Sequence, residues 1–541
     1  QIKREVPQRD NMSCTIYQQK YPNTHSVIQS HEKVKIIDKV FIGDPKEVKS
    51  KGSQRLRWNL VFNICIWILI TIPFWLPFVP KLNLSIVLYV LLGLQGAFSI
   101  FFLIVSLLAL RALFVVFGYR NYDFTQDEDV KKILPKLTHL VILSCYKEPI
   151  ELISKTIQSV ASQTMAKNVI MVVGFEEKTP DRLGKQIQIA EKFGNIFQDL
   201  ISSVHPYGVE GEIPGKCSNS NCAIRTAVSH LQELQGSTFD AKHVIITNCD
   251  ADSNFHPKYI EALSYKFVKE KNPTESVFQS PLLYNWNLDA SSVITRVTGI
   301  IRSYLMMGAM IPFNINTMSI FSFSASLCIA GDYVHPGYQM DDIIALIRWM
   351  GVTKKTIKTV FVPVPVISGP TSGRTIEDEI EEWARQARRW TIGASEVFHY
   401  FVIKSRNIPF FTAITWGITF FIYYGIILCG SALYNVSLSL SLAFVFPGPL
   451  PEYVQYIMYG FGGLQYIVFF VVFVIDALIL KTTKPRVHER ISIIRNVVHW
   501  ILSPLVLLMY SFVEFYAIHE VVFRGKKVCK HGASKKENLN V

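Results

Sequence analysis

The chain has 541 residues, of which half are apolar, 13% are aromatic and only 18% are charged. This composition excludes a disordered protein and a small disulfide-stabilised scaffold, and the length exceeds what one hydrophobic core usually supports. The net charge of +13 suits either nucleic acid or the cytosolic flanks of membrane spans. Because no nucleic-acid-binding motif accompanies it, we predict a lipid bilayer and no nucleic acid as partner.

Two long uncharged runs near the N-terminus predict a transmembrane hairpin at residues 58–118. Residues 59–78 and 84–110 are each long enough to cross a hydrocarbon layer of about 30 Å as a helix. Arg and Lys residues precede the first run and follow the second. The positive-inside rule therefore places both flanks, including the N-terminal segment 1–57, in the cytosol.

Residues 119–406 regain charge and alternate strand-like with helix-like runs, which predicts a globular α/β domain in the cytosol. The uncharged segment 303–331 inside it could be mistaken for a membrane span. Because this segment contains Pro312 and many Asn, Ser and Thr residues, we expect it to be buried in the domain or to lie against the membrane. Residues 376–400 predict an amphipathic helix along the membrane surface.

Apolar runs return in the region 407–520 and predict three or four membrane spans. The runs 409–433, 453–480 and 491–518 are long, and a softer run at 438–446 is either a fourth crossing or a re-entrant piece. The basic loop 481–490 and the basic tail 521–541 both favour the cytosol. A single span between them would place them on opposite sides of the membrane. Pro504 could break the last run into an interfacial piece and a short hairpin, so the number of spans stays open.

Polar side chains follow the first two predicted strands of the α/β domain. Residues 140–143 and 169–173 read as apolar strands on either side of a helix, which indicates parallel strands whose carboxyl ends hold ligands. The first strand leads into Tyr146 and Glu148, and the second leads into Glu176 and Glu177. These side chains are candidates for ligand binding.

A pair of aspartates follows the apolar strand that starts at Val244. In an extended chain alternate side chains share a face, so Asp250 and Asp252 can hold a divalent cation such as Mg²⁺ or Mn²⁺ and, through it, a diphosphate. The simpler interpretation is a solvated loop or a cap for the next helix.

Two further clusters are candidates for catalysis or for substrate binding. Asp341 and Asp342 begin an apolar helical run, where they suit the helix dipole, but a carboxylate with a like-charged neighbour is also a good general base. In the amphipathic helix 376–400, Arg389 suits a phosphate and Trp390 suits the face of a sugar ring. The simpler interpretation of that helix is a basic interfacial anchor.

The order of these motifs resembles that of the processive family 2 glycosyltransferases, which include cellulose, hyaluronan, chitin and mannan synthases. The resemblance covers roughly residues 138–400, and apolar runs flank it on both sides. It rests on three motifs, Asp250-Ala251-Asp252, Met340-Asp341-Asp342 and Gln386-x-x-Arg389-Trp390. Two earlier segments match as well. Cys145-Tyr146-Lys147-Glu148-Pro149 looks like the family's nucleotide-binding opening, and Gly215-Lys216 with Asn219 looks like the segment beneath the donor.

The resemblance implies a membrane α-helical bundle joined to a cytosolic α/β domain of the GT-A (nucleotide-diphospho-sugar transferase) class, with amphipathic interface helices. Asp250 and Asp252 would hold Mg²⁺ or Mn²⁺. Asp342, beside Asp341, would deprotonate the acceptor hydroxyl. Attack by that oxygen would then invert the configuration of the anomeric carbon. Donor and acceptor would be bound by Tyr146, Glu148, Glu176, Lys216, Asp250, Gln386, Arg389 and Trp390.

The implied activity is the polymerisation of a nucleotide sugar, for which we take UDP-glucose, into a β-linked polysaccharide that leaves through the protein's own channel. The chain departs from the family at Met340-Asp341, where Thr-Glu is usual, and at Glu176 or Glu177, where an Asp contacts uridine. Chitin, hyaluronan or mannan synthesis, or transfer of single sugars to a lipid, therefore remain alternatives. A transporter with a cytosolic regulatory domain is the alternative from another class. Whether the membrane is the plasma membrane or an internal secretory one, and whether the protein is a homo-oligomer, stays open.

Overall fold

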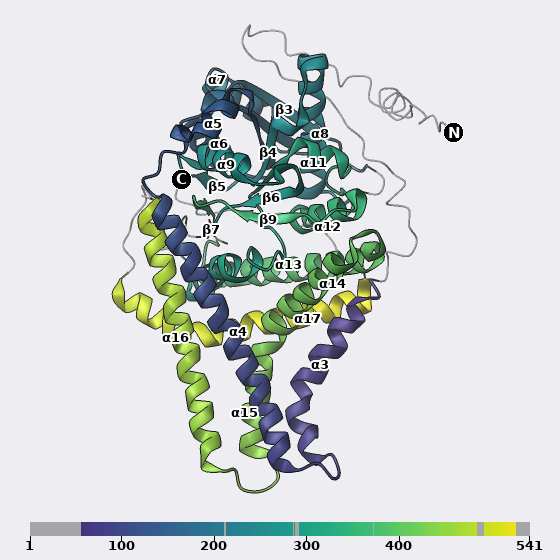
Figure 1. The fold of residues 1–541 in the computed structure, drawn as a ribbon, viewed down its shortest axis with the longest axis vertical. Helices are drawn as coiled ribbons and strands as arrows, with labels where there is room; N and C mark the ends of the chain where they lie inside the picture. The colour runs from purple at the N-terminus through teal and green to yellow at the C-terminus, as the bar shows by residue number, and fades with distance from the viewer. Residues whose placement is uncertain are drawn as a thin grey trace, which may run out of the picture.

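The computed structural model describes residues 56–525 apart from residues 210–211, 285, 287–290, 370, 372 and 484–491. Figure 1 shows an α/β domain above a bundle of long helices, with helices α13 (Ile376–Lys404) and α17 (Ile493–Arg524) between the two parts. The predicted N-terminal segment 1–57, the basic loop 481–490 and the tail 521–541 lie mostly outside the described residues.

A mixed seven-stranded sheet forms the centre of the α/β domain, in the order β3-β2-β1-β4-β8-β6-β9. The first four strands are parallel, β8 runs antiparallel to both β4 and β6, and β9 is parallel to β6. A second sheet has the order β5-β10-β7. The strands are β1 (Thr138–Cys145), β2 (Val169–Glu176), β3 (Asp199–His205), β4 (Val244–Asp250), β5 (Ser253–Phe255), β6 (Ser276–Gln279), β7 (Leu282–Leu283), β8 (Phe321–Ser324), β9 (Lys358–Phe361) and β10 (Val366–Ser368).

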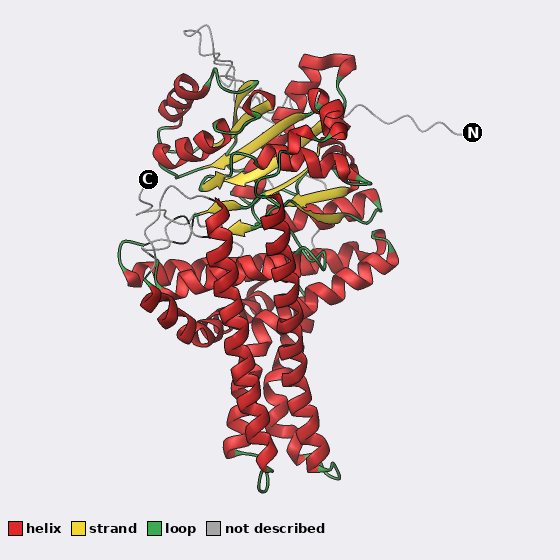
Figure 2. Ribbon diagram, turned by 60° about the vertical axis from the view of Figure 1, so that its left-hand side comes forward, coloured by secondary structure: helices red, strands yellow, loops and turns green. Residues whose placement is uncertain are grey.

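Helices cover the large sheet, and its central strands are buried as a result (Figure 2). Strands β1 and β2 are therefore nearly continuous apolar runs, as is usual for parallel strands with both faces covered. The register places Val141 of β1 opposite Met171 of β2 and Thr247 of β4. The helices of this domain include α5 (Glu128–Ile133), α6 (Ile150–Ala161), α7 (Arg182–Phe193), α8 (Lys216–Gln235), α9 (Tyr259–Lys269), α10 (Val293–Leu305), α11 (Ala325–Ala330) and α12 (Asp341–Thr353).

The uncharged segment 303–331 belongs to the α/β domain. It contains the end of α10, a π-helical turn (Met306–Met310), strand β8 inside the large sheet, and α11. The hydroxyl groups of Tyr304 and Ser106 lie 2.8 Å apart, so the start of the segment packs against the long apolar helix α4. The segment is thus buried in the domain and lies against a candidate span, as the sequence analysis expects.

Five helices in the described part of the chain are long and apolar enough to cross a membrane. The softer run 438–446 is not a separate element, because α14, a π-helical stretch and α15 form one continuous helix over Phe410–Phe444. The five helices comprise α3 with its 3₁₀ extension (Asn59–Phe78), α4 (Leu84–Tyr119), the helix formed by α14 (Phe410–Phe420), the π-helical stretch (Phe421–Gly430) and α15 (Ser431–Phe444), then α16 (Glu452–Thr483) and α17.

The last helix, α17, lies across the bundle, whereas α3, α4, α15 and α16 run lengthwise away from the α/β domain (Figure 1). The end of α16 and both ends of α17 consequently lie on the side of the α/β domain. The basic loop and the basic tail, which start from these ends, can therefore share one side of a membrane. A lateral α17 removes the conflict that the sequence posed.

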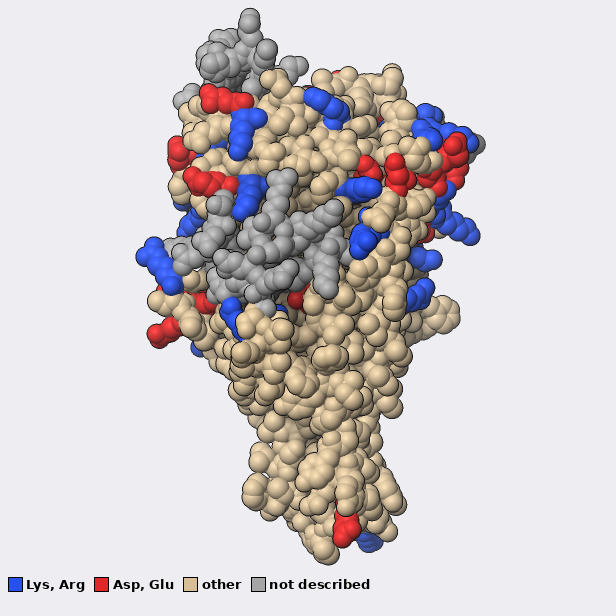
Figure 3. Space-filling model, turned by 90° about the vertical axis from the view of Figure 1, so that its left-hand side faces the viewer, with Lys and Arg blue, Asp and Glu red and all other residues tan. Residues whose placement is uncertain are grey.

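The surface changes character between the two parts (Figure 3). Lys, Arg, Asp and Glu side chains are spread over the α/β domain, while the bundle surface below is almost free of them. Large apolar side chains are exposed on the bundle helices, among them Leu107, Phe444 and Ile467. Such a surface suits a hydrocarbon environment and indicates association with a membrane.

Candidate active site

A cavity of about 590 Å³ lies at the carboxyl ends of the parallel strands, on the side that faces α13. Its wall is assembled from β1, β2, β4 and the starts of α8 and α12, together with α10 and α13. Apart from Glu177, the side chains that the sequence singles out as site residues line this one cavity: Tyr146, Glu148, Glu176, Lys216, Asp250, Asp252, Asp341, Asp342, Gln386, Arg389 and Trp390.

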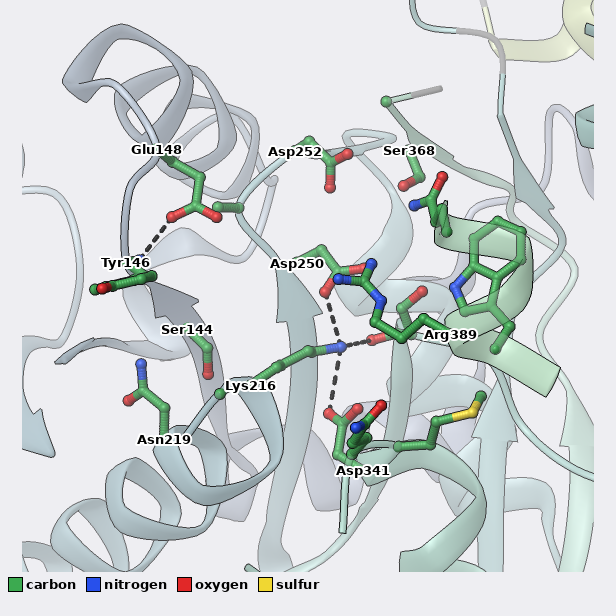
Figure 4. A pocket seen from close by; sticks show the side chains of 18 of the residues that line it. Ser144, Tyr146, Glu148, Lys216, Asn219, Asp250, Asp252, Asp341, Ser368 and Arg389 are labelled. Atoms are coloured by element: carbon green, nitrogen blue, oxygen red, sulfur yellow. Dashed lines mark hydrogen bonds and ion pairs between the residues drawn. The ribbon is translucent and has the colours of Figure 1, made fainter. Parts of the chain in front are cut away.

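Lys216 connects two of the acidic clusters (Figure 4). Its Nζ lies 2.8 Å from Asp250 Oδ1 at the end of β4 and 3.2 Å from Asp341 Oδ2 at the start of α12. Burial lowers the pKa of Lys216, but the two carboxylates outweigh this effect and raise it above its ordinary value. The ammonium group therefore stays charged at the centre of the site.

Helix α8 is held in place beneath this lysine by Asn219. The Asn219 side chain donates to the backbone carbonyls of Cys145 (3.2 Å) and Gly174 (3.0 Å) at the ends of β1 and β2. A Cβ atom at Gly174 would lie 2.6 Å from Asn219 Oδ1, so this position needs glycine. The spacing of Lys216 and Asn219 thus fixes the start of α8 against the sheet.

Asp341 and Asp342 are both buried but have different surroundings. Asp341 accepts from Asn248 Nδ2 and pairs with Lys216, whereas Asp342 Oδ1 accepts from the backbone N–H of Ile343 (2.9 Å). Burial, together with the charge of Asp341, raises the pKa of Asp342 to about 7. A carboxyl group with such a pKa is suited to accept a proton near neutral pH.

Asp250 and Asp252 offer two carboxylates next to each other, with Asp252 only 5% exposed. The backbone N–H of Gly369 donates to the Asp252 carbonyl (3.0 Å), and a Cβ atom at Gly369 would lie 2.7 Å from Asp252 Oδ2. Within the described ranges no three His, Cys, Asp or Glu side chains form a complete metal site. Two hard oxygen ligands fit Mg²⁺ or Mn²⁺ when a phosphate supplies further oxygens.

The part of the cavity nearest the bundle is aromatic and basic. The Arg302 guanidinium lies 3.5 Å from the centre of the Trp390 ring and 4.7 Å from that of Tyr284. Gln386 Oε1 accepts from Thr371 Oγ1, and burial lowers the pKa of Arg389. Arg302 and Tyr284 were not predicted from the sequence, because nothing in their spacing links them to Trp390, which is far away along the chain.

Tyr146 and Glu148 follow β1 as predicted, but Glu148 also has a structural contact. Its Oε2 accepts from the backbone N–H of Tyr146 (2.6 Å), and its carbonyl accepts from Lys185 Nζ (2.7 Å). The carboxylate of Glu148 therefore shapes the turn that presents Tyr146 to the cavity.

The structure distinguishes between the two glutamates that follow β2. Glu176 lines the cavity and is 7% exposed, whereas Glu177 Oε2 accepts from the backbone N–H of Tyr207 (2.8 Å) and fixes a loop. Glu176 pairs with His205, which in turn pairs with Glu212; neither partner was found from the sequence. The only available signal was the place of His205 at the end of a third parallel strand.

Scans against models of protein families and against curated protein sequences find no match. Among solved structures, mannosyltransferase PcManGT from Pyrobaculum calidifontis with GDP-Man and Mn²⁺ has 13% identity and a TM-score of 0.40, over 70% of this chain and 97% of that chain. S. aureus TarS (1–349) with UDP has 14% identity and a TM-score of 0.29, over 71% and 91%. M. tuberculosis glucosyl-3-phosphoglycerate synthase with Mn²⁺, UDP-glucose and glycerol 3-phosphate has 13% identity and a TM-score of 0.27, over 52% and 84%.

The structure shows the architecture of this chain directly. It is a mixed-sheet α/β domain, in which the parallel half leads into Asp250-Ala251-Asp252 directly after β4, joined to five long apolar helices in the described part of the chain. The predicted combination of an α/β domain with long apolar helices is thereby confirmed.

Proposed function

We propose that this protein is a membrane-embedded, inverting glycosyltransferase that polymerises a nucleotide sugar, with UDP-glucose as our first choice, into a β-linked polysaccharide. The observation that carries the proposal is the convergence of three distant clusters in one cavity, next to the bundle: Asp250 with Asp252, Asp341 with Asp342, and Gln386 with Arg389 and Trp390. The α/β domain would lie in the cytosol, and the membrane is either the plasma membrane or an internal secretory one.

The donor diphosphate would lie between the end of β4 and the start of α8. Asp250 and Asp252 would hold Mg²⁺ or Mn²⁺, which when bound neutralises the charge of the leaving diphosphate. Lys216 at the amino end of α8 and Arg389 of α13 add positive charge from the protein itself. Tyr146 and Glu176 line the part of the cavity left for the nucleoside.

The acceptor hydroxyl would lose its proton to Asp342, whose raised pKa matches this task. Asp341 is engaged by Lys216 and Asn248, so it is less suited to take a proton and serves to raise the pKa of its neighbour. Direct attack by the acceptor on the face opposite the diphosphate inverts the anomeric carbon and gives a β-linkage from an α-linked donor.

The acceptor end would stack on Trp390, beyond which a smaller cavity continues into the bundle. This second cavity of about 50 Å³ is lined by Asp342, Trp390, Tyr424 and Tyr510, among others. A third cavity of about 60 Å³ shares Leu428 with it and is lined mainly by apolar side chains, with a few polar ones among them such as Gln95, Asn435 and Gln465. Polar side chains between apolar helices support an export route for the polymer.

A second candidate is a transferase that adds one sugar to a lipid. Cavities of about 50 and 60 Å³ have room for only a few water molecules, so a sugar chain passes only if the helices move apart. This closed route is the observation that favours the second candidate, and product length distinguishes the two.

The test is a donor panel with purified protein in lipid nanodiscs and Mn²⁺. UDP-glucose, UDP-N-acetylglucosamine, UDP-glucuronate and GDP-mannose are offered one at a time, and both nucleoside diphosphate release and product size are measured. We expect one donor to give release together with a polymer that a β-glycosidase degrades. Release with a single-sugar lipid product would favour the second candidate, and no release from any donor would contradict both.

A further inference from the structure

A histidine lies between two buried glutamates beside the nucleoside end of the cavity. His205, the last residue of β3, places Nδ1 2.9 Å from Glu176 Oε2 and Nε2 2.7 Å from Glu212 Oε2. The side chains of all three residues are less than 10% exposed. Both Glu176 and Glu212 line the cavity, whereas His205 stands behind them.

The geometry requires a protonated imidazole. Both ring nitrogens face carboxylate oxygens, which only accept hydrogen bonds, and a neutral imidazole could donate to one of them only. Burial lowers the pKa of His205, but the hydrogen bonds and charges of Glu176 and Glu212 outweigh it and raise that pKa to about 9. The ring can then donate from both nitrogens at once, which fixes the position of the Glu176 side chain.

One oxygen of Glu176 is left for a ligand. Oε2 is engaged by His205, whereas Oε1 is buried and has no hydrogen-bond partner among the described residues. A buried carboxylate oxygen without a partner is costly unless a ligand supplies a hydrogen-bond donor. Because Glu176 lines the cavity on the same side as Tyr146, that donor would come from the nucleoside.

We propose that His205 is a positioning residue for donor specificity: clamped by Glu212, it holds the Glu176 side chain so that Oε1 accepts a hydrogen bond from a ring N–H of the nucleobase. This inference rests on the proposed function. It selects bases with a protonated ring nitrogen, namely uracil (N3–H) and guanine (N1–H). Cytosine and adenine present a lone pair at that ring position, which would face the carboxylate and be repelled.

The neighbouring loop supports this clamp. The backbone N–H of Glu177 donates to the His205 carbonyl (2.8 Å), and Glu177 Oε2 holds the backbone of Tyr207. The Lys178 ammonium lies 3.2 Å from the centre of the Tyr207 ring. These contacts hold the residues directly after β3 beside the end of β2.

The first test measures calorimetric binding of UDP, GDP, CDP and ADP in the presence of Mn²⁺ to the full chain and to His205→Gln. His230→Gln is the matched control, because His230 also pairs with a carboxylate (Asp199, 3.0 Å), but that carboxylate does not line the cavity. We expect the parent protein to prefer UDP or GDP. His205→Gln should bind the preferred nucleotide about tenfold more weakly, with CDP and ADP little changed, since a hydrogen bond to a charged group contributes about 1.5–3 kcal/mol.

Unchanged nucleotide preference in His205→Gln would overturn the inference. Equal binding of all four nucleotides by the parent protein would also overturn it. Either result would leave the proposed function intact. Failure of the parent protein to bind any of them would instead overturn the proposed function. The results for UDP and GDP distinguish the two keto bases.

A second variant covers the case in which His205→Gln does not fold. Glu212→Gln keeps the pair of His205 and Glu176 but removes one of the two carboxylates that face the ring. The pKa of His205 should then fall, so affinity for the preferred nucleotide should decrease from about pH 6 to about pH 8.5, relative to the parent protein. A constant ratio of the two affinities over this range would contradict the clamp.

Discussion

Two neighbouring aspartates, Asp341 and Asp342, illustrate how surroundings divide roles between like residues. Burial raises the pKa of both carboxyl groups, but Lys216 and a hydrogen bond from Asn248 oppose this effect at Asp341, whereas the charge of Asp341 adds to it at Asp342. Only one carboxylate of such a pair readily gives up its proton at a given pH. This division makes Asp342 the better general base.

Replacement of Asp342 by Asn should remove the proton acceptor and leave the donor site in place. We expect the transfer rate of Asp342→Asn to fall about 10²–10⁴-fold, while binding of the preferred nucleoside diphosphate with Mn²⁺ stays within about twofold of the parent value. Asp378→Asn, at an exposed acid in the first turn of α13, is the control and should keep the parent rate. Full transfer activity in Asp342→Asn would remove the assigned base.

The raised pKa of Asp342 also predicts a pH dependence. Because the carboxyl group must be deprotonated to accept a proton, kcat should rise with pH through about 7 and level off above it. The measurement is the initial rate of nucleoside diphosphate release at saturating donor between about pH 5.5 and about pH 8.5. A profile that is flat, or that decreases over this range, would show that another group limits the reaction.

At the scale of elements, the local sequence pattern predicted parallel strands. Strand β8 and the side-chain pairs of the site depend on long-range contacts, which the local pattern does not contain. The predicted strands 140–143 and 169–173 lie inside β1 and β2, because fully buried parallel strands are apolar runs. Strand β8 was not predicted. It lies in the uncharged segment 303–331, where two serines alternate with two phenylalanines. The pair Arg302–Trp390 had no signal in the sequence, and for His205–Glu176 the only signal was the place of His205 at a strand end, since the fold alone brings these partners together.

The junction between the α/β domain and α4 depends on a close approach at Gly308. A Cβ atom there would lie 2.3 Å from the backbone oxygen of Val105, which cannot move without shifting α4. Gly308→Ala should therefore lower the stability by about 1–3 kcal/mol, measured as a lower temperature of thermal unfolding in detergent.

Gly93→Ala on the same helix α4 is the matched control, because nothing lies within 4 Å of the added Cβ atom. It should leave the unfolding temperature unchanged or raise it slightly, since alanine favours helix over glycine. Equal unfolding temperatures for Gly308→Ala and the parent protein would mean that the junction is not tightly packed.

At the scale of the whole molecule, the arrangement couples the site to the bundle. Helices α13 and α17 lie between the α/β domain and the lengthwise helices (Figure 1). One small cavity starts at Trp390, and a second one in the bundle shares Leu428 with it. Synthesis and export of a polymer could then share one path. The sequence left the span count open, and the lateral position of α17 explains why charge alone did not settle it.

Leu428 lines both small cavities of the proposed export route, so a larger side chain at this position should block the route. In Leu428→Trp we expect shorter products on gels, with the KM for the donor within about twofold of the parent value because the donor site is unchanged. Leu440→Trp is the control, since Leu440 lies on the same continuous helix with its side chain exposed on the bundle surface. Unaltered product length in Leu428→Trp would contradict an export route at this position.

The most direct test of the account is a cryo-electron microscopy structure of the full chain in nanodiscs with Mn²⁺ and a non-transferable analogue of the donor that the panel identifies. We predict the metal bound to the carboxylates of Asp250 and Asp252, the diphosphate between Lys216 and Arg389, and the sugar carbon facing Asp342. A donor bound away from these residues, or a cavity that stays empty at saturating analogue, would contradict the proposal that these three clusters form one glycosyl-transfer site.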